Sequence, residues 1–349
     1  MQLIKPDINI DFMSKSKIAL IFSGLLIFIS LASLIFHKGP NFGIDFAGGS
    51  LIQIKFSKEV AIEQIRGGLN SIGLGDASVQ EFGSAKDEHE YLIRTASGEI
   101  QAEGFSSLFS DALSKSTGIT PEIRRVEMVG PAIGQELQNK ALLAIFYSLL
   151  FITIYISARF ENKLFLSAIT AGSIMSAVYF LSIFKAGIAF LIIGALIISL
   201  VIFWFFKFKY AIAAICALLH DVFITIGVFS IFGREFSLPV VAALLTIIGY
   251  SLNDTIIIFD RIRENIKKDG KAATPLIKLT NKSINETLSR TLLTSGTTLI
   301  AVLALYFLGG EIINNFAFAM IIGICVGTYS SIYIASPIVL AVDRTDYGR

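Results

Sequence analysis

Three ionisable side chains lie within runs of otherwise apolar residues, where a charge is costly. Asp254 follows Asn253 in TIIGYSLNDTIIIF, Asp221 follows His220 in CALLHDVFITIG, and Arg290 begins a later run. In a bilayer, a charge at a helix centre costs about 2.5–3.5 kcal/mol on insertion scales, so such residues usually face a bundle interior or a water-filled cavity. A carboxyl group in this setting can carry a proton, because burial disfavours its charged form and a nearby arginine favours it.

The spacing of the polar residues predicts a buried polar seam between two helices. Asp254 and Arg290 occupy neighbouring depths on helices joined by one loop, so they can pair. We expect Asp254 and Arg290 to couple proton movement, while a static ion pair that only holds helices together is the alternative. For Asp221, the sequence is compatible with a role in proton coupling and with a structural hydrogen bond. The supporting polar residues on these helices are Thr246, Tyr250, Asn253, His220, Thr294, Thr297 and Thr298.

Glycines and one further aspartate predict structural motifs. In GIDFAGG, the Asp45 side chain suits a turn in which it accepts backbone N–H groups, with glycine next to it for unusual φ angles. In the last apolar run, a GxxxG spacing predicts close packing of two helices. The glycine and proline positions assigned to such motifs are Gly43, Gly48, Gly49, Gly130, Pro131, Gly323 and Gly327.

The composition indicates a polytopic α-helical membrane protein. Of the 349 residues, 54% are hydrophobic and only 16% are charged, whereas a soluble domain carries roughly a quarter charged residues. Both cysteines, Cys216 and Cys325, fall inside apolar runs and predict packing rather than a disulfide. Eight runs are long enough to span a bilayer: 18–36, 140–158, 164–184, 187–206, 209–232, 237–259, 289–308 and 314–341.

Charge asymmetry predicts the orientation of these spans. Basic residues concentrate in the N-terminal segment 1–17, in the loop 260–288 and in the C-terminal segment 342–349, whereas the short loops on the opposite side carry only Lys185 and Arg234. By the positive-inside rule, both termini are cytoplasmic. The first run is longer than the apolar part of a signal peptide, which predicts a retained anchor.

Residues 37–139 form one long hydrophilic segment, which this orientation places outside the cytoplasm. Its periodicity predicts the order β-α-β-β-α-β, the ferredoxin-like split motif. The segment has nine basic and fourteen acidic residues, so nucleic acid is not an expected partner. We find neither a nucleophile constellation nor a His/Cys cluster in it, so we expect no enzymatic activity and no metal site.

Five ordered blocks of the sequence are FGIDFAGGSLIQIKF (42–56), VGPAIGQEL (129–137), ALLHDVFITIGVFSIF (217–232), AALLTIIGYSLNDTIIIFDRIREN (242–265) and NETLSRTLLTSGTTL (285–299). Together they resemble SecF proteins, the smaller partners of SecD in the bacterial Sec protein-export machinery. The resemblance implies a subunit, in the RND superfamily, that uses the proton motive force to assist late translocation of secretory proteins across the inner (cytoplasmic) membrane. It implies SecD, the SecYEG channel, YajC and an unfolded preprotein as partners, and an H⁺ gradient in place of a cofactor.

Two departures from the family pattern stand out. Ala47 replaces a threonine that is common in the first block. Residues 159–208 form an apparent inserted apolar hairpin between the second span, 140–158, and the pair 209–259 that precedes the final pair 289–341. A shift of 48 positions aligns parts of this hairpin with the pair that follows, so it is either a degenerate duplicate or a chance similarity between apolar hairpins.

Two other functions remain as alternatives. An intramembrane aspartyl protease also places two aspartates on adjacent spans, but the GxGD sequence of such enzymes is missing here. An RND-type proton-coupled small-molecule exporter is the closer alternative. Such exporters double the bundle and the exported domain in one chain, so this chain resembles half of such a machine.

The inserted hairpin gives a test of the eight-span topology. If both of its helices span the membrane, a cysteine that replaces Lys185 should react with a membrane-impermeant thiol reagent added on the extracytoplasmic side. Labelling from the cytoplasmic side alone would instead indicate a re-entrant hairpin and six spans.

Overall fold

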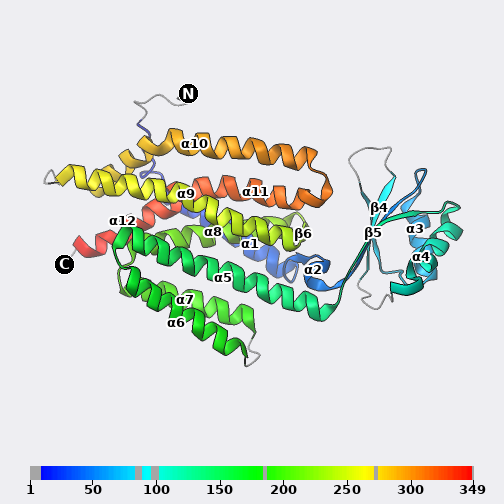
Figure 1. Cartoon of the computed structure of the whole chain (residues 1–349). Helices are drawn as coiled ribbons and strands as arrows, with labels where there is room; N and C mark the ends of the chain where they lie inside the picture. The colour runs from blue at the N-terminus through cyan, green and yellow to red at the C-terminus, as the bar shows by residue number, and fades with distance from the viewer. Residues whose placement is uncertain (1–8, 83–88, 96–101, 184–186, 271–273, 348–349) are drawn as a thin grey trace.

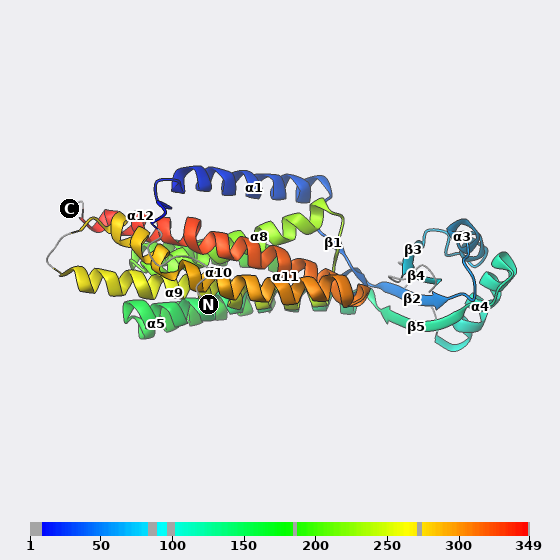
Figure 2. The ribbon, with the colours of Figure 1, turned by 90° about the horizontal axis from the view of Figure 1, so that it is seen from above.

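The structure is a computed structural model that describes residues 9–82, 89–95, 102–183, 187–270 and 274–347. It consists of a long helical bundle with a small α/β domain at one end (Figures 1 and 2). Lys185, which the sequence analysis places in a loop opposite the cytoplasm, lies outside the described residues.

The bundle contains long apolar helices that run along a common direction (Figure 1). Among the described residues, eight helical segments are long and apolar enough to cross a membrane, the number predicted from the sequence. The last of these begins in α11, passes through one turn of π-helix at Ser331–Ala335 and ends in α12. The bundle helices are α1 (Ser16–Phe36), α5 (Pro131–Glu161), α6 (Leu164–Ile183), α7 (Ile188–Phe205), α8 (Lys209–Ile231), α9 (Leu238–Asp269), α10 (Leu276–Leu308), α11 (Glu311–Ser330) and α12 (Ser336–Tyr347).

Three helices extend further than the hydropathy pattern predicts. Helix α5 begins at Pro131, nine residues before the predicted span 140–158. The predicted basic loop 260–288 is mostly helical, because α9 continues to Asp269 and α10 begins at Leu276. At 1.5 Å per residue, the 32 residues of α9 extend about 48 Å, well beyond a hydrocarbon core about 30 Å thick. Polar residues mark where the apolar span ends in the sequence, but the helix itself can continue through them.

The α/β domain has the predicted β-α-β-β-α-β order. Its antiparallel sheet has the strand order β3-β4-β2-β5, which places the first and third strands of the motif at the centre, as in a ferredoxin-like fold. Helices α3 and α4 cover one face of the sheet (Figure 2). The elements are β2 (Gly49–Lys55), α3 (Ile62–Ser71), β3 (Ser78–Phe82), β4 (Glu90–Thr95), α4 (Ala102–Thr117) and β5 (Glu122–Val129).

The α/β domain has a hydrophobic core of its own. Ile52 and Ile54 of β2 and Ile93 of β4 alternate with outward residues, and all three are fully buried against α3 and α4. Phe109 and Leu113 of α4 complete this core, to which no bundle residue contributes. The domain can therefore fold without the membrane helices.

Short elements join the domain to the bundle. The residues IDFA form a four-residue helix, α2 (Ile44–Ala47), where the sequence predicted a turn. Strand β1 (Asn41–Phe42) pairs in parallel with β6 (Glu235–Phe236), the strand between α8 and α9. This pairing was not predicted, because two-residue strands leave no periodicity in the sequence.

The independent core predicts that residues 49–129, expressed alone, fold as a soluble domain of mixed α/β content by circular dichroism. Replacing the buried Ile54 by Ala should lower its free energy of unfolding by about 2–5 kcal/mol, because it leaves a cavity. The matched change Val126→Ala, at an exposed position, should alter it far less. A random-coil spectrum of the isolated domain under native conditions would contradict the independent core.

Candidate functional site

Asp221 of α8 lies at the centre of a hydrogen-bonded cluster inside the bundle. Its side chain is fully buried. Its Oδ2 accepts hydrogen bonds from the hydroxyl of Ser251 on α9 at 2.6 Å and from that of Ser330 on α11 at 2.9 Å. Its Oδ1 lies 2.9 Å from Nδ1 of His220. Three helices therefore contribute to the setting of this one carboxyl group.

His220 connects the Asp221 cluster to the first helix. Its ring stacks on Tyr329 of α11 with 6.2 Å between the ring centroids. The Tyr329 hydroxyl donates to the backbone oxygen of Ala19 at 2.7 Å and accepts from Ser23 at 3.0 Å, so α1 joins the same network. The other ring nitrogen of His220 is buried without a hydrogen-bond partner.

Asp254 of α9 forms a second buried cluster. Its side chain points inward, and the residue is 2% exposed. Its Oδ2 accepts a hydrogen bond from the hydroxyl of Ser295 on α10 at 3.1 Å, and Ser295 accepts one from Thr328 on α11 at 2.8 Å. Thr328 and Ser330 lie two positions apart on α11, so one helix supplies hydroxyl groups to both carboxyl clusters.

The predicted GxxxG glycines let α11 approach α9 closely. A Cβ atom at Gly323 would lie 2.3 Å from the side chain of Ile247, and one at Gly327 would lie 2.8 Å from Cβ of Ser251. Any larger residue would push the two helices apart. Because Ser251 also bonds Asp221, this close packing brings the hydroxyl groups of α9 and α11 to the same carboxylate.

The predicted pairing of Asp254 with Arg290 does not take the form of an ion pair. Both residues lie in the described part of the chain, yet no ion pair joins them. Arg290 is close enough for its charge to act on Asp254, but its side chain is exposed. The reason is rotation about α10: Ser295 faces inward and contacts Asp254, whereas Arg290 faces the surface of the bundle.

The predicted seam lies partly on the surface of this chain. Asn253 and Thr246 of α9 and Thr297 of α10 are exposed, while Tyr250 is half-buried with a hydroxyl that has no hydrogen-bond partner. Thr294 donates to the backbone oxygen of Arg290 at 3.0 Å. We refer to the exposed polar residues Thr246, Asn253, Arg290 and Thr297 as the polar stripe.

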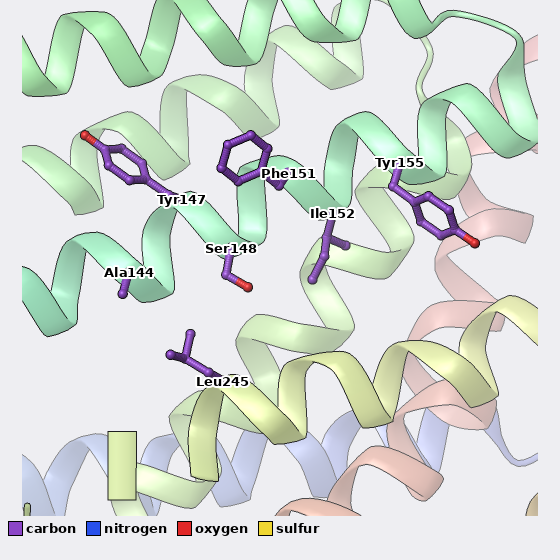
Figure 3. Close-up of a pocket in the computed structure, with 7 residues that line it drawn as sticks. All are labelled: Ala144, Tyr147, Ser148, Phe151, Ile152, Tyr155 and Leu245. Carbon is purple, nitrogen blue, oxygen red and sulfur yellow. The ribbon is translucent and has the colours of Figure 1, made fainter. Parts of the chain in front are cut away.

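A shallow apolar groove lies between α5 and α9 (Figure 3). Its volume is about 650 Å³. Helix α10 lies on the other side of α9 (Figure 1). Figure 3 shows Ile152 and Ser148 of α5 on the side of Leu245 of α9, whereas the Tyr147 and Tyr155 rings point elsewhere. Its lining contains no carboxylate, histidine or cysteine, so the groove offers a packing surface rather than a reaction site.

The GIDFAGG motif fixes the junction between the two parts of the molecule. Asp45 accepts the backbone N–H of Leu238 at 2.9 Å, so it caps the first turn of α9 rather than its own turn. Gly48 has φ of +75° and lies against the backbone of Pro131, where a Cβ atom would not fit. Gly130 is the N-cap residue of α5, and Pro131 is the first residue of the helix, where proline is favoured. Gly49 begins β2, and Gly43 lies against Glu235.

Four hydroxyl residues of the two clusters were not predicted from the sequence. Ser251, Ser295, Thr328 and Ser330 lie in apolar runs, where serine and threonine commonly bond their own helix backbone and give no signal of their own. Helical spacing places Ser251 three residues before Asp254 and Ser330 three after Gly327, but it does not show that both hydroxyl groups bond Asp221. Among the described residues, no group of three or more His, Cys, Asp or Glu could hold a metal ion.

Two family models match the sequence. The one described as "Protein export membrane protein SecD/SecF, C-terminal" matches residues 109–197 and 173–345, which together cover most of the chain. The one described as "SecD/SecF GG Motif" matches residues 33–60, the region that contains Asp45 and the junction glycines.

Curated relatives are similar over nearly the whole length. A protein translocase subunit SecF from Calditerrivibrio nitroreducens is 43% identical over 98% of this chain and 97% of its own. One from Vibrio alginolyticus is 42% identical over 97% of this chain and 91% of its own. One from Escherichia coli O157:H7 is 34% identical over 95% of this chain and 87% of its own.

Two solved structures of SecDF proteins match this chain. The crystal structure of SecDF from Thermus thermophilus superposes with a TM-score of 0.68 at 32% identity over 98% of this chain. A SecDF structure in a super-membrane-facing form superposes with a TM-score of 0.61 at 33% identity. This chain spans only 40% of each solved SecDF chain. By sequence and by fold, the chain belongs to the SecF family.

Proposed function

We propose that this protein is the SecF-type half of a SecDF-like complex that uses the proton motive force to assist late translocation of secretory proteins. The observation that carries the proposal is the pair of buried carboxyl groups, Asp221 and Asp254, inside an apolar bundle. Family membership indicates that the process is protein export. The two carboxyl clusters offer groups to which a proton can bind. No bond to the substrate is made or broken in this function, so it is not enzymatic.

Asp254 is the proposed proton carrier. Its carboxyl accepts a hydrogen bond from the neutral hydroxyl of Ser295. The positive charge of Arg290 also acts on it, without direct contact. Because a lone hydroxyl compensates a buried negative charge only in part, a proton on Asp254 would remove that charge at little structural cost. A proton that crosses 100 mV releases about 2.3 kcal/mol, enough to bias a bundle between two arrangements.

Asp221 is the proposed second member of the coupling. It has hydroxyl donors on α9 and α11 together with His220, so it is better compensated than Asp254. Since α11 contributes to both clusters, a change at Asp254 that moves α11 would also alter the surroundings of Asp221. In this proposal, Asp221 responds to the proton on Asp254 rather than carrying it.

A SecD-type half is the proposed partner on the face formed by α5, α9 and α10. The polar stripe lies on α9 and α10, and the shallow groove lies between α5 and α9, so a second bundle against these helices would bury both. The SecYEG channel, YajC and the unfolded preprotein are the further partners in the proposal. The complex lies in the inner membrane with both termini cytoplasmic and the α/β domain outside.

A half of a small-molecule exporter is the competing function. Co-purification with a SecD-like protein, followed by assays of precursor export and of drug efflux in a depleted strain, separates the two. Loss of precursor export with intact efflux supports the proposal. An imposed H⁺ or Na⁺ gradient in proteoliposomes then identifies the coupling ion.

Asp254→Asn tests the proton carrier. The change keeps the size of the side chain and the hydrogen bond from Ser295 but removes titration, so the variant should assemble with its partner and lose the gradient-dependent part of precursor export. The measurement is export in proteoliposomes with and without an imposed gradient. The matched control is Asp260→Asn on the same helix, which removes an exposed carboxylate paired with Arg159 and should leave export unchanged.

A stable, assembled Asp254→Asn variant with full gradient-driven export would rule out the proton carrier. A loss of export that only follows reduced recovery of the complex would indicate that Asp254 merely holds helices together.

Arg290→Met tests the influence of the arginine on Asp254. Removing the charge should impair the same gradient-dependent step, and the double variant with Asp254→Asn should be little worse than either single variant, because coupled residues are not additive. Lys278→Met, an exposed cation on α10, serves as the control. Additive losses in the same export assay would show that the two residues act independently.

A further inference from the structure

The turn between α8 and α9 holds two adjacent charged residues whose side chains bind different parts of the molecule. Arg234 binds the bundle: it donates to Asn314 and Asn315 at the start of α11 and to the hydroxyl of Tyr306 on α10, the last at 2.9 Å. Its guanidinium also lies 4.7 Å from the centre of the Phe318 ring. Arg234 therefore fastens this turn to α10 and α11.

Glu235 binds the α/β domain. Its carboxylate forms an ion pair with Arg94 of β4, the second strand from the edge of the sheet. The backbone of Glu235 pairs with Asn41 in the β1–β6 ladder. A Cβ atom at Gly43 would lie 2.5 Å from Oε1 of Glu235, so Gly43 leaves the carboxylate just enough room. The contact is specific in position as well as in charge.

The same turn is joined directly to the helices that carry the buried carboxyl groups. It follows α8, which contains Asp221, and precedes α9, which contains Asp254. Asp45 caps the first turn of α9 and lies near Glu235, so the junction motif and the turn form one unit. A shift of α8 against α9 must therefore move Glu235.

From this connection we propose that Arg234, Glu235 and Arg94 form a mechanical link that transmits rearrangement at the buried carboxyl groups to the orientation of the α/β domain. This proposal rests on the proposed proton-coupled function. It names the residues through which a change at the buried carboxyl groups would reach the α/β domain. Through its bonds to α10 and α11, Arg234 makes the turn move together with these helices. Through its ion pair with Arg94, Glu235 then moves β4. These are positioning residues, and none of them carries the proton.

The surroundings of the ion pair suit movement better than permanent fastening. A cavity of about 620 Å³ opens beside it, between the uncovered face of the sheet and the bundle, and leaves room for the domain to tilt. Burial raises the pKa of Glu235 above its ordinary value, Arg94 opposes this effect, and Asp45 adds to it. The Nε of Arg94 is buried without a hydrogen-bond partner. This partly buried ion pair therefore adds little to the stability of the folded state.

The test measures domain orientation and export in the same reconstituted complex. Spin labels on cysteines that replace Glu63 of α3 and Lys140 of α5, both exposed, report the distance between domain and bundle once the native cysteines are replaced by alanine. With the link intact, an imposed gradient should shift the distance distribution. In Arg94→Gln and in Glu235→Gln this shift should vanish, and export should fall to its gradient-independent level. The double variant should be no worse than either single variant.

Two controls separate the link from a merely structural role. Arg125→Gln makes the same chemical change in the lining of the same cavity, where Arg125 pairs with Glu127 of its own strand, and it should leave the distance shift unchanged. Glu235→Gln should change the melting temperature of the complex little, because burial, which raises the pKa of Glu235, offsets much of what the ion pair with Arg94 contributes, and the glutamine amide can still accept a hydrogen bond from Arg94. As pH rises through that pKa, the melting temperature of the native chain should fall relative to that of the glutamine variant.

Three outcomes of these experiments would contradict the proposed link. Retention of the distance shift and of gradient-driven export in both single variants would overturn the link while leaving the proposed function intact. Loss of export in proportion to a lowered melting temperature would also overturn it, since the pair would then only stabilise the fold. Absence of any gradient-dependent export in the unaltered complex would remove the proposed function, and the link with it.

Discussion

The structure of this bundle depends on the need to compensate two carboxyl groups inside a membrane protein. A buried carboxylate without donors would cost several kcal/mol, so each must be reached by hydroxyl or ring groups from other helices. For Asp221 these come from α9 and α11, and for Asp254 from α10. Helix α11 can serve both clusters only because its glycines let it lie against α9. The packing of the bundle is thus adjusted to the polar groups within it, and a bulkier α11 would leave the carboxyl groups without donors.

Much of this architecture could be predicted because strong periodic signals carry it. Eight apolar runs predicted eight spans, and alternation in β2 and β4 predicted the strands of the α/β domain. The helix ends were less accurate, since hydropathy reports where a helix leaves the membrane and not where it stops. Helix α9 illustrates this: its last residues are charged and lie beyond the membrane core, yet the helix continues to Asp269. The GIDFAGG motif was recognised as structural, but its partner, the backbone of Leu238, is distant in sequence and could not be inferred.

The candidate site was predicted less completely, for a physical reason. Spacing predicts which residues share a helix face but does not show which neighbour that face meets. Asp254 and Asn253 are adjacent in sequence, yet one is buried and the other exposed, since successive residues in a helix are rotated by about 100°. The same rotation separates Ser295, which reaches Asp254, from Arg290, which does not. Serine and threonine in apolar runs usually bond their own backbone, so the particular hydroxyl groups that bond the carboxylates are visible only in three dimensions.

The exposure of Arg290 has a consequence for assembly. An arginine facing lipid near the middle of a span costs about 2.5–3.5 kcal/mol, and the other exposed polar side chains of the polar stripe add to that cost. Arg290 begins the apolar part of α10, so its long side chain can extend toward the headgroups, whereas Asn253 and Thr246 of α9 are too short to do so. A second helical half against α9 and α10 would supply partners for these groups, and the apolar groove beside α9 would receive its side chains. The fact that this chain spans 40% of the solved SecDF chains agrees with such an arrangement. Burial of the stripe would also bring Arg290 into a lower dielectric, where its charge acts more strongly on Asp254. Assembly with a second half would therefore complete the proposed proton site as well as cover it.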